Sequence, residues 1–213
     1  NWDSTFAEMI KNRLTLLYGF FLELYNKGRT KRESIDYWMD HELNGIIRDA
    51  ELFMEKTLFR SAIQKIYFDL QRSLKWYLRR TIPQKKVMNR IITTQLLLLS
   101  PFAPHLCEEI WKGIGKKTFI SLESWPSGIS VEYHGEEEVI KKIFDDIKAL
   151  LKIVKFTPKH IYLYVIPSEK SFVGEALHFF EREFSLAVSL FSTTDTNLYD
   201  PQKKSTKATK GRA

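Results

Sequence analysis

Apolar side chains recur every three or four residues along most of the first 110 positions, the spacing of one face of an α-helix. The leucines at 96–99 leave the last long helix apolar on all sides, as expected for a helix surrounded by others. Pro101 and Pro104 then interrupt the pattern and predict a corner, followed by a short helix that ends near Gly113. Long helices are predicted at 3–27, 34–55, 58–80 and 83–99. Long helices joined by short loops predict an antiparallel helix bundle.

A different pattern begins after Trp125-Pro126. Turn-forming and scattered polar residues come first, and helical spacing returns at Glu136. A β-branched and aromatic run at 160–166 predicts a strand, and a further helix and strand are predicted at 168–184 and 186–191. The predicted fold class is therefore mainly α, a helix bundle followed by a small α+β domain. The predicted division is a bundle over 1–126, a linker over 127–135, an α+β domain over 136–200 and a basic tail over 201–213.

Composition narrows the setting in which the protein works. The 213 residues are 44% hydrophobic, and no apolar run is long enough to span a bilayer. The single cysteine, Cys107, excludes an internal disulfide and fits a reducing compartment, so we expect a cytoplasmic protein with no membrane partner. Net charge is +7, and five basic residues with no carboxylate lie in the last thirteen positions, which leaves +2 for residues 1–200. The body of the chain is nearly balanced, and its tail is basic.

No residue pattern in the chain predicts catalysis or a bound metal. The five histidines and one cysteine lack the spacing of a metal site. Residues 113–118 resemble a phosphate-binding loop, but position 110 is isoleucine where such a loop needs glycine. Adjacent carboxylates such as Asp145 and Asp146 are typical of a solvated helix face. We expect no catalytic residue, no metal and no cofactor in this chain.

A basic stripe is the feature best suited to binding. Lys65, Arg72 and Arg79 are seven residues apart, which on an α-helix returns to nearly the same face, and Lys75 lies between them. With Trp76 nearby, such a ridge could follow a phosphate backbone and stack a base. A solvated helix face with intrahelical ion pairs is the open alternative. The candidate contacts are Lys65, Arg72, Lys75, Arg79, Arg80, Lys85, Lys86 and Arg90, with Lys203, Lys204, Lys207, Lys210 and Arg212 of the tail.

Four segments resemble landmarks of the class I aminoacyl-tRNA synthetases. Residues 100–111 (SPFAPHLCEEIW) are similar to the corner of their helical anticodon-binding domain, and residues 35–39 (IDYWM) to a segment that opens one of its helices. Residues 74–80 (LKWYLRR) and 124–126 (SWP) look like two further landmarks in the same order. The corner and the residues after 136 resemble the archaeal branch of the leucyl enzymes. We expect six residues to hold the bundle corner: Trp76, Pro101, Pro104, His105, Glu109 and Trp111.

This resemblance implies the tRNA-binding part of a leucine–tRNA ligase. In that family ATP and leucine are handled by a module that bears H-I-G-H and K-M-S-K-S motifs, and neither motif occurs in this chain. ATP and Mg²⁺ would thus belong to the rest of such an enzyme, and this part alone should be inactive. Its expected partners are tRNA, above all leucine tRNA, and the catalytic module of the same synthetase, with no DNA.

Two alternatives stay open. The bundle could be a protein-docking or structural module of a split or inactive synthetase paralogue, which predicts a large exposed apolar surface. It could also be the equivalent part of an isoleucyl or valyl enzyme, with the same fold and a different amino acid.

Overall fold

The computed structural model describes residues 3–154, 158–165, 170–185 and 187–192 of the chain. The described chain is mainly helical, as predicted. Its contacts divide it into two compact units, Asn1–His134 and Gly135–Ala213.

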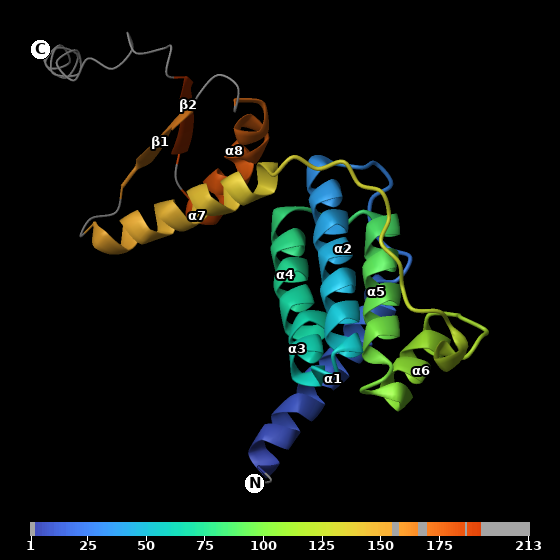
Figure 1. The fold of residues 1–213 in the computed structure, drawn as a ribbon. Helices are drawn as coiled ribbons and strands as arrows, with labels where there is room; N and C mark the ends of the chain where they lie inside the picture. The colour runs from blue at the N-terminus through green and yellow to red at the C-terminus, as the bar shows by residue number, and fades with distance from the viewer. Residues whose placement is uncertain (1–2, 155–157, 166–169, 186, 193–213) are drawn as a thin grey trace, which may run out of the picture. The chain divides into compact units, whose positions relative to one another are not determined.

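The first unit is a bundle in which α2, α4 and α5 stand side by side (Figure 1). Asp3 begins the first helix, because its carboxylate accepts hydrogen bonds from the backbone N–H groups of Thr5 and Phe6. The elements are α1 (Ser4–Leu24), α2 (Ser34–Glu55), α3 (Phe59–Ile63), the π-helical η1 (Gln64–Asp69), α4 (Leu70–Arg80), α5 (Lys85–Leu99), α6 (Pro104–Gly113) and the 3₁₀ turn η2 (Ile120–Leu122).

The core of this bundle contains large side chains from every long helix. Phe21 of α1, Trp38 of α2, Tyr77 of α4 and Met88 of α5 are all fully buried. Burying a side chain of this size stabilises a fold by about 1.5–3 kcal/mol. The hydrophobic contacts between helices therefore supply most of the energy that holds the bundle together.

The prediction of a single α-helix over 58–80 is wrong in the middle of that range. A π-helical stretch, η1, separates α3 from α4. The buried Gln95 of α5 donates from Nε2 to the Ile66 carbonyl, at 3.0 Å, and accepts from the Nε2 of Gln71 at 3.1 Å. A side chain from a distant helix thus bonds a backbone group in the irregular stretch, and hydrophobic periodicity does not reveal such a contact.

The helix predicted to open at Pro83 begins two residues later. Gln84 is its N-cap, and the Gln84 side chain accepts a hydrogen bond from the backbone N–H of Val87 at 3.1 Å. Pro83 thus lies in the preceding loop, where its carbonyl bonds another loop of the bundle.

The segment that follows η2 is held against the bundle. The Asn44 side chain of α2 donates to the Ile129 carbonyl at 2.7 Å and accepts from the Ile129 N–H at 3.0 Å. The ring of Tyr133 lies 5.2 Å from that of His41. These contacts anchor residues 129–133 along α2.

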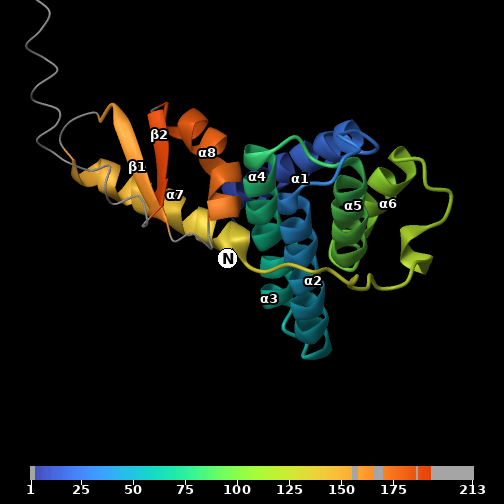
Figure 2. The ribbon, with the colours of Figure 1, turned by 90° about the horizontal axis from the view of Figure 1, so that it is seen from above.

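The second unit consists of α7 (Glu136–Ile153), β1 (His160–Val165), α8 (Lys170–Phe184) and β2 (Ala187–Ser192). The two strands pair in parallel with α8 as the crossover, and His160 lies opposite Ala187 (Figure 2). Phe144 of α7 packs on Phe179 of α8, with 5.5 Å between ring centroids. An aromatic core between α7 and α8 thus supports this unit.

Candidate nucleic-acid interface

A buried carboxylate, that of Asp36, joins three parts of the bundle. Asp36 has no exposed surface and accepts hydrogen bonds from both terminal nitrogens of Arg29, at 2.8 and 2.9 Å. It also accepts from the backbone N–H of Glu33 and from the hydroxyl of Tyr77. Bidentate pairing with a guanidinium is among the strongest polar contacts in proteins. Two of the family-like segments, 35–39 and 74–80, thus meet at this carboxylate.

Tyr77 extends the same network toward the next loop. Its hydroxyl accepts a hydrogen bond from the backbone N–H of Gln84 at 2.8 Å while it donates to Asp36. Burial, and then the hydrogen bond to Asp36, raise the pKa of the Tyr77 hydroxyl far above its ordinary value. Tyr77 therefore stays protonated and acts as a fixed donor.

The loop between α1 and α2 lies against the loop between α4 and α5. The Arg29 N–H donates to the Pro83 carbonyl at 3.0 Å, and the Lys85 N–H donates to the Arg29 carbonyl at 2.9 Å. Gly28 has φ +118°, and a Cβ at this position would lie 2.3 Å from the Pro83 oxygen. Only glycine permits so close an approach of the two backbones.

This contact creates a strongly basic end of the bundle, defined here as residues 27–32 and 79–86. Neither segment contains a carboxylate. Arg29 and Arg32 pair with Asp36 and Asp40, whereas Lys27 and Lys31 are exposed. The cations of the basic end are Lys27, Arg29, Lys31, Arg32, Arg79, Arg80, Lys85 and Lys86.

Two cations at this end are placed against their helix dipole. Lys85 and Lys86 are exposed in the first turn of α5, and no acidic residue accompanies them there. The N-terminus of a helix carries partial positive charge, so lysines at this position are electrostatically unfavourable unless an anion is nearby. The N–H groups of Gln84, Lys85 and Val87 already have partners, so the two lysines are the groups at this end of α5 that suit a phosphate.

The predicted stripe on α4 is only partly present. Arg72 has a side chain 75% exposed and lies 3.4 Å from Asp69, while Lys75 is exposed and Trp76 is half-buried against the core. Arg79 and Arg80 lie in the last turn of the same helix and continue into the basic end. This part of the stripe gives the basic end a side wall along α4.

Lys65 lies in the π-helical stretch, but it reaches the same carboxylate as Arg72, because both cations lie 3.4 Å from Asp69. Its Nζ lies 3.1 Å from the Asp49 carboxylate of α2 and 3.4 Å from that of Asp69. The hydrogen bond to Asp49, opposed by desolvation, raises the Lys65 pKa. Lys65 thus ties two helices together.

Arg90 is also engaged inside the bundle. Its guanidinium donates to the buried Asp40 at 2.7 Å and to the Asn44 side chain at 2.7 Å, and its side chain is only 17% exposed. A phosphate contact would have to compete with that buried pair. The tail candidates, 203–212, lie outside the described residues.

Four cations of the basic end, Lys27, Arg29, Lys31 and Arg32, are absent from the candidates that the sequence predicts. Lys27 and Lys31 belong to the run Lys-Gly-Arg-Thr-Lys-Arg at 27–32, which carries four cations in six residues. Most of this run lies between the helices predicted at 3–27 and 34–55, and its charge density is a usable signal. Its position beside residues 79–86 is visible only in the tertiary structure.

The corner at 100–111 is held differently from the prediction. Trp111 is buried as expected, and Pro104 opens α6 at its first turn. His105 and Glu109, however, are exposed. The carboxylate that bonds the following loop belongs to Glu108, which accepts from the backbone N–H groups of Ile120 and Ser121 at 3.0 and 3.2 Å.

The remaining predicted corner residues have separate environments. Pro101 is exposed beyond the end of α5, and Trp76 packs on the core from α4, away from the α5–α6 corner in the sequence. The corner itself is therefore closed chiefly by Trp111 and Glu108.

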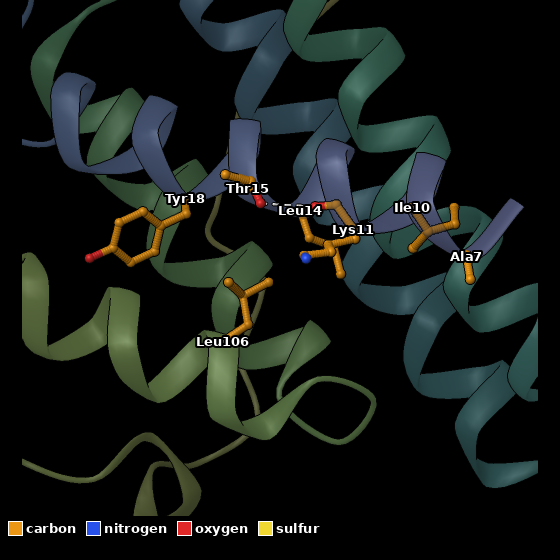
Figure 3. A pocket seen from close by; sticks show the side chains of 7 residues that line it. All are labelled: Ala7, Ile10, Lys11, Leu14, Thr15, Tyr18 and Leu106. Atoms are coloured by element: carbon orange, nitrogen blue, oxygen red, sulfur yellow. Dashed lines mark hydrogen bonds between the residues drawn. The ribbon is translucent and has the colours of Figure 1, made fainter. Parts of the chain in front are cut away.

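An apolar groove lies along the first half of α1 (Figure 3). Its volume is about 540 Å³, and its lining includes Ile10, Leu14 and Tyr18 of α1 and Leu106 of α6. Phe6 and Met9 are 57% and 38% exposed, so the apolar face predicted for this helix is buried only in its second half, at Leu17 and Phe21. Such a face is unusual unless a partner covers it.

Other kinds of site find little support in the described part of the chain. The described residues contain no group of three or more His, Cys, Asp or Glu side chains that could hold a metal ion. Burial raises the pKa of the Cys107 thiol to about 12, so the thiol is neutral and a poor nucleophile at neutral pH. Among these same residues no helix is both long and apolar enough to cross a bilayer.

The amino-acid sequence matches a known protein family. A family model described as the anticodon-binding domain of tRNA ligase matches residues 36–163. The chain belongs to this family, and the resemblance inferred from the sequence is confirmed.

The chain is also similar in sequence to curated leucine–tRNA ligases. A leucine–tRNA ligase of Pyrococcus abyssi is 32% identical over 179 residues, which are 79% of this chain and 18% of the relative. One of Methanocaldococcus jannaschii is 36% identical over 171 residues, which are 76% of this chain and 18% of the relative. The chain thus spans about a fifth of the length of the relatives it matches.

A solved structure is also similar in part. It is titled as the ternary complex of Agrobacterium radiobacter K84 agnB2 LeuRS-tRNA-LeuAMS. The match has a TM-score of 0.48 and 18% identity, and covers 71% of this chain and 23% of that chain. A likeness at this level adds nothing to the assignment, which rests on the family model.

Proposed function

We propose that this chain is the tRNA-binding part of a cytoplasmic leucine–tRNA ligase. It would hold leucine tRNA while a catalytic part outside these 213 residues attaches leucine with ATP and Mg²⁺. The basic end carries this proposal, because it concentrates exposed lysines within a bundle of the anticodon-binding family.

The basic end suits a phosphate backbone better than it suits a particular sequence. Lysine ammonium groups bind phosphates as point charges, and such contacts set position and orientation without reading bases. The network of Arg29, Asp36 and Tyr77 fixes both loops, so the exposed lysines are held near one another before RNA arrives. Less order must then be imposed on binding, which favours affinity.

We propose a division of the chain into domains that fits this role. We assign the tRNA-binding bundle to 1–126, a linker to 127–135, a small α+β domain to 136–200 and a basic tail to 201–213. The five cations of the tail would add contacts to the phosphate backbone.

Binding of the full chain to leucine, serine and isoleucine tRNAs across a salt series tests the proposal. We expect tighter binding to leucine tRNA and an affinity that falls steeply with salt, because released counterions dominate such binding. Equal affinity for all three tRNAs would leave a generic electrostatic surface. A preference for isoleucine tRNA would support the isoleucyl alternative, and no binding to any tRNA would refute the proposal.

A matched pair of variants locates the surface. Lys31→Ala with Lys86→Ala removes two exposed cations from the basic end, and Lys56→Ala with Arg60→Ala removes two beyond the opposite end of α2. The first pair should lower the slope of log affinity against log salt by roughly 1.5, since each phosphate contact contributes about 0.7–0.9. The second pair should leave it unchanged, and equal effects would remove the basic end from consideration.

The α1 groove favours a second role beside RNA binding. We propose that the catalytic part of the ligase docks on the apolar face formed by Phe6, Met9, Ile10 and Leu14. This role would combine the docking alternative with the RNA-binding one. Exposed apolar area on one helix is the observation that supports it.

Docking is tested with the catalytic part of a leucine–tRNA ligase supplied as a separate chain. Phe6→Ser with Met9→Ser should abolish association measured by calorimetry, because both side chains lie on the proposed contact face. Glu8→Ser, at an exposed site two residues from Phe6 and so on nearly the opposite side of the helix, is the control and should not affect association. Unchanged association in the double variant would refute this role and leave the RNA test standing.

A further inference from the structure

The segment that leads out of the bundle is bonded to α2 through one side chain. The amide of Asn44 donates to the Ile129 carbonyl at 2.7 Å and accepts from the Ile129 N–H at 3.0 Å, so it satisfies both backbone groups of that residue. Gly128 permits this approach, because a Cβ at position 128 would lie only 3.3 Å from the Asn44 Oδ1. The pairing resembles that of neighbouring strands, in which one residue exchanges both N–H···O bonds with its partner. Residue 129 is therefore held in a defined position on the bundle.

Arg90 fixes the orientation of the Asn44 amide. The Arg90 Nη2 donates to the Asn44 Oδ1 at 2.7 Å, while the Nη1 donates at 2.7 Å to Asp40, which is only 2% exposed. A guanidinium has only donors, so the amide oxygen must face it, and the amide nitrogen is directed at Ile129. A flipped amide would lose all three of its hydrogen bonds. Arg90 is thus a positioning residue that acts through Asn44.

A second contact lies four residues further along the same segment. The Tyr133 ring lies 5.2 Å from that of His41. His41 and Asn44 are three residues apart on α2, so they lie on one face of that helix. Residues 129–133 therefore follow this face of α2, and we call them the strap.

The strap ends close to the start of the second unit. Because α7 begins at Glu136, two residues, His134 and Gly135, separate it from the strap. The two compact units of the chain divide between these residues, and Gly135 has φ +93°, which glycine adopts without strain. If the whole connector 127–135 were extended, it would span about 30 Å, whereas two residues span about 7 Å, a reach about fourfold shorter.

We propose that Asn44, oriented by Arg90, clamps the strap and so limits how far the second unit can reach from the bundle. The nine-residue connector 127–135 then works as a two-residue joint. A short connection raises the effective concentration of one surface near another, and a long slack connection lowers it. This inference goes beyond the proposed function, because it concerns the connection between the units and needs no RNA.

Distances between spin labels test the clamp in the full chain. Glu51→Cys on α2 and Lys152→Cys on α7 supply two exposed attachment sites, and the native Cys107 is buried. Asn44→Ala should broaden the distance distribution from double electron–electron resonance at least about twofold, because a freed connector samples many conformations. Distances up to roughly 20 Å longer should appear, since each residue of 127–133 adds about 3.3 Å when extended. An unchanged distribution would overturn the proposal.

Two further variants separate loss of the clamp from damage to the bundle. Gly128→Val crowds the Asn44 amide from the connector and changes no residue of a helix, so it should broaden the distribution as Asn44→Ala does. Arg90→Lys keeps the positive charge without the planar fork that reaches two acceptors, so a smaller broadening is expected. Asn89→Ala is the matched control, because its side chain bonds Asn26 elsewhere in the bundle. Equal broadening in the control would indicate general loosening and would refute the clamp.

The backbone amide of Ile129 gives a local readout. Its N–H is bonded to Asn44, so its hydrogen exchange, followed by NMR, should accelerate at least about tenfold in Asn44→Ala. Asn89→Ala should leave that rate unchanged. Faster exchange with an unchanged distance distribution would mean that the clamp does not limit reach, and the proposal would be wrong. None of these measurements uses RNA, so their failure leaves the proposed function standing, and a failure to bind tRNA leaves the clamp standing.

Discussion

Two family-like regions of the bundle differ in how their characteristic residues are used. In segments 35–39 and 74–80 the polar landmarks, Asp36 and Tyr77, are buried and bonded to each other. In the corner at 100–111 two polar landmarks, His105 and Glu109, are exposed, and a third, Glu108, makes the bonds. Similarity of sequence was equally clear in both regions.

This difference shows that the presence of a residue in a shared motif does not tell whether that residue stabilises the fold. A polar residue in a motif stabilises the structure when it is buried and fully bonded, as Asp36 is. An exposed residue in a motif contributes little to folding, as we expect for His105. Five substitutions test this contrast, from the largest expected effect to the smallest.

Replacing Asp36 should have the largest effect. Asp36→Ala leaves the Arg29 guanidinium, only 17% exposed, with the half-exposed Glu33 as its remaining carboxylate and removes the acceptor of the buried Tyr77 hydroxyl, so it should cost about 3–5 kcal/mol of unfolding free energy. Urea denaturation followed by tryptophan fluorescence measures the loss. The control is Asp49→Ala on the same helix, where a partly exposed pair with Lys65 should contribute no more than about 1 kcal/mol. Equal losses in the two variants would contradict a larger contribution of the buried network to the free energy of unfolding.

Gly28→Ala should come next. The added Cβ meets the Pro83 carbonyl, and φ +118° is strained for alanine, so we expect a loss of about 1–3 kcal/mol in thermal or urea unfolding. Gly115→Ala is the comparison, because Gly115 also has positive φ but no atom lies within 4 Å of its added Cβ. A smaller loss at position 115 would isolate the contact between the two loops from backbone strain alone.

Glu108→Gln should give a smaller loss that depends on pH. Desolvation opposes ionisation of Glu108, but hydrogen bonds from Ile120 and Ser121 outweigh it and lower its pKa below 4.5. A lowered folded-state pKa means that the stabilisation is complete above pH 4.5 and disappears as pH falls through the folded value. The stability difference between the two proteins should therefore shrink in acid. A difference that is constant from pH 7 to pH 3 would contradict this account of Glu108.

His105→Ala and Glu109→Ala should have the smallest effects. Both side chains are exposed, so each change should lie within about 0.5 kcal/mol of zero in the same denaturation assay. A loss above 1 kcal/mol at either position would restore the role that the sequence predicted for the corner.

The helices themselves were largely predictable. The helix predicted over 34–55 matches α2 (Ser34–Glu55), because its apolar residues keep a helical period along its length. The π-helical stretch at 64–69 could not be predicted, since the Gln95 side chain that bonds it comes from another helix.

The sequence predicted that the candidate site is basic, but it did not predict all of the cations that belong to the site. The cations of 72–86 were found because charge is visible in sequence. Lys27 and Lys31 were missed and Arg90 was included, since only the fold shows which loops meet and which cations already have a buried partner.

The sequence by itself determined the class of this protein: a mainly helical chain, with motifs of the anticodon-binding family and a surplus of positive charge. Such properties are local, and each can be read from a few neighbouring residues. Tertiary structure alone decided that residues 27–32 lie beside 79–86, that Asp36 and Tyr77 share a hydrogen bond, and that β1 pairs with β2 in parallel. The physical reason is that these contacts join residues far apart in the chain, and their partners are chosen by packing of the whole bundle or unit.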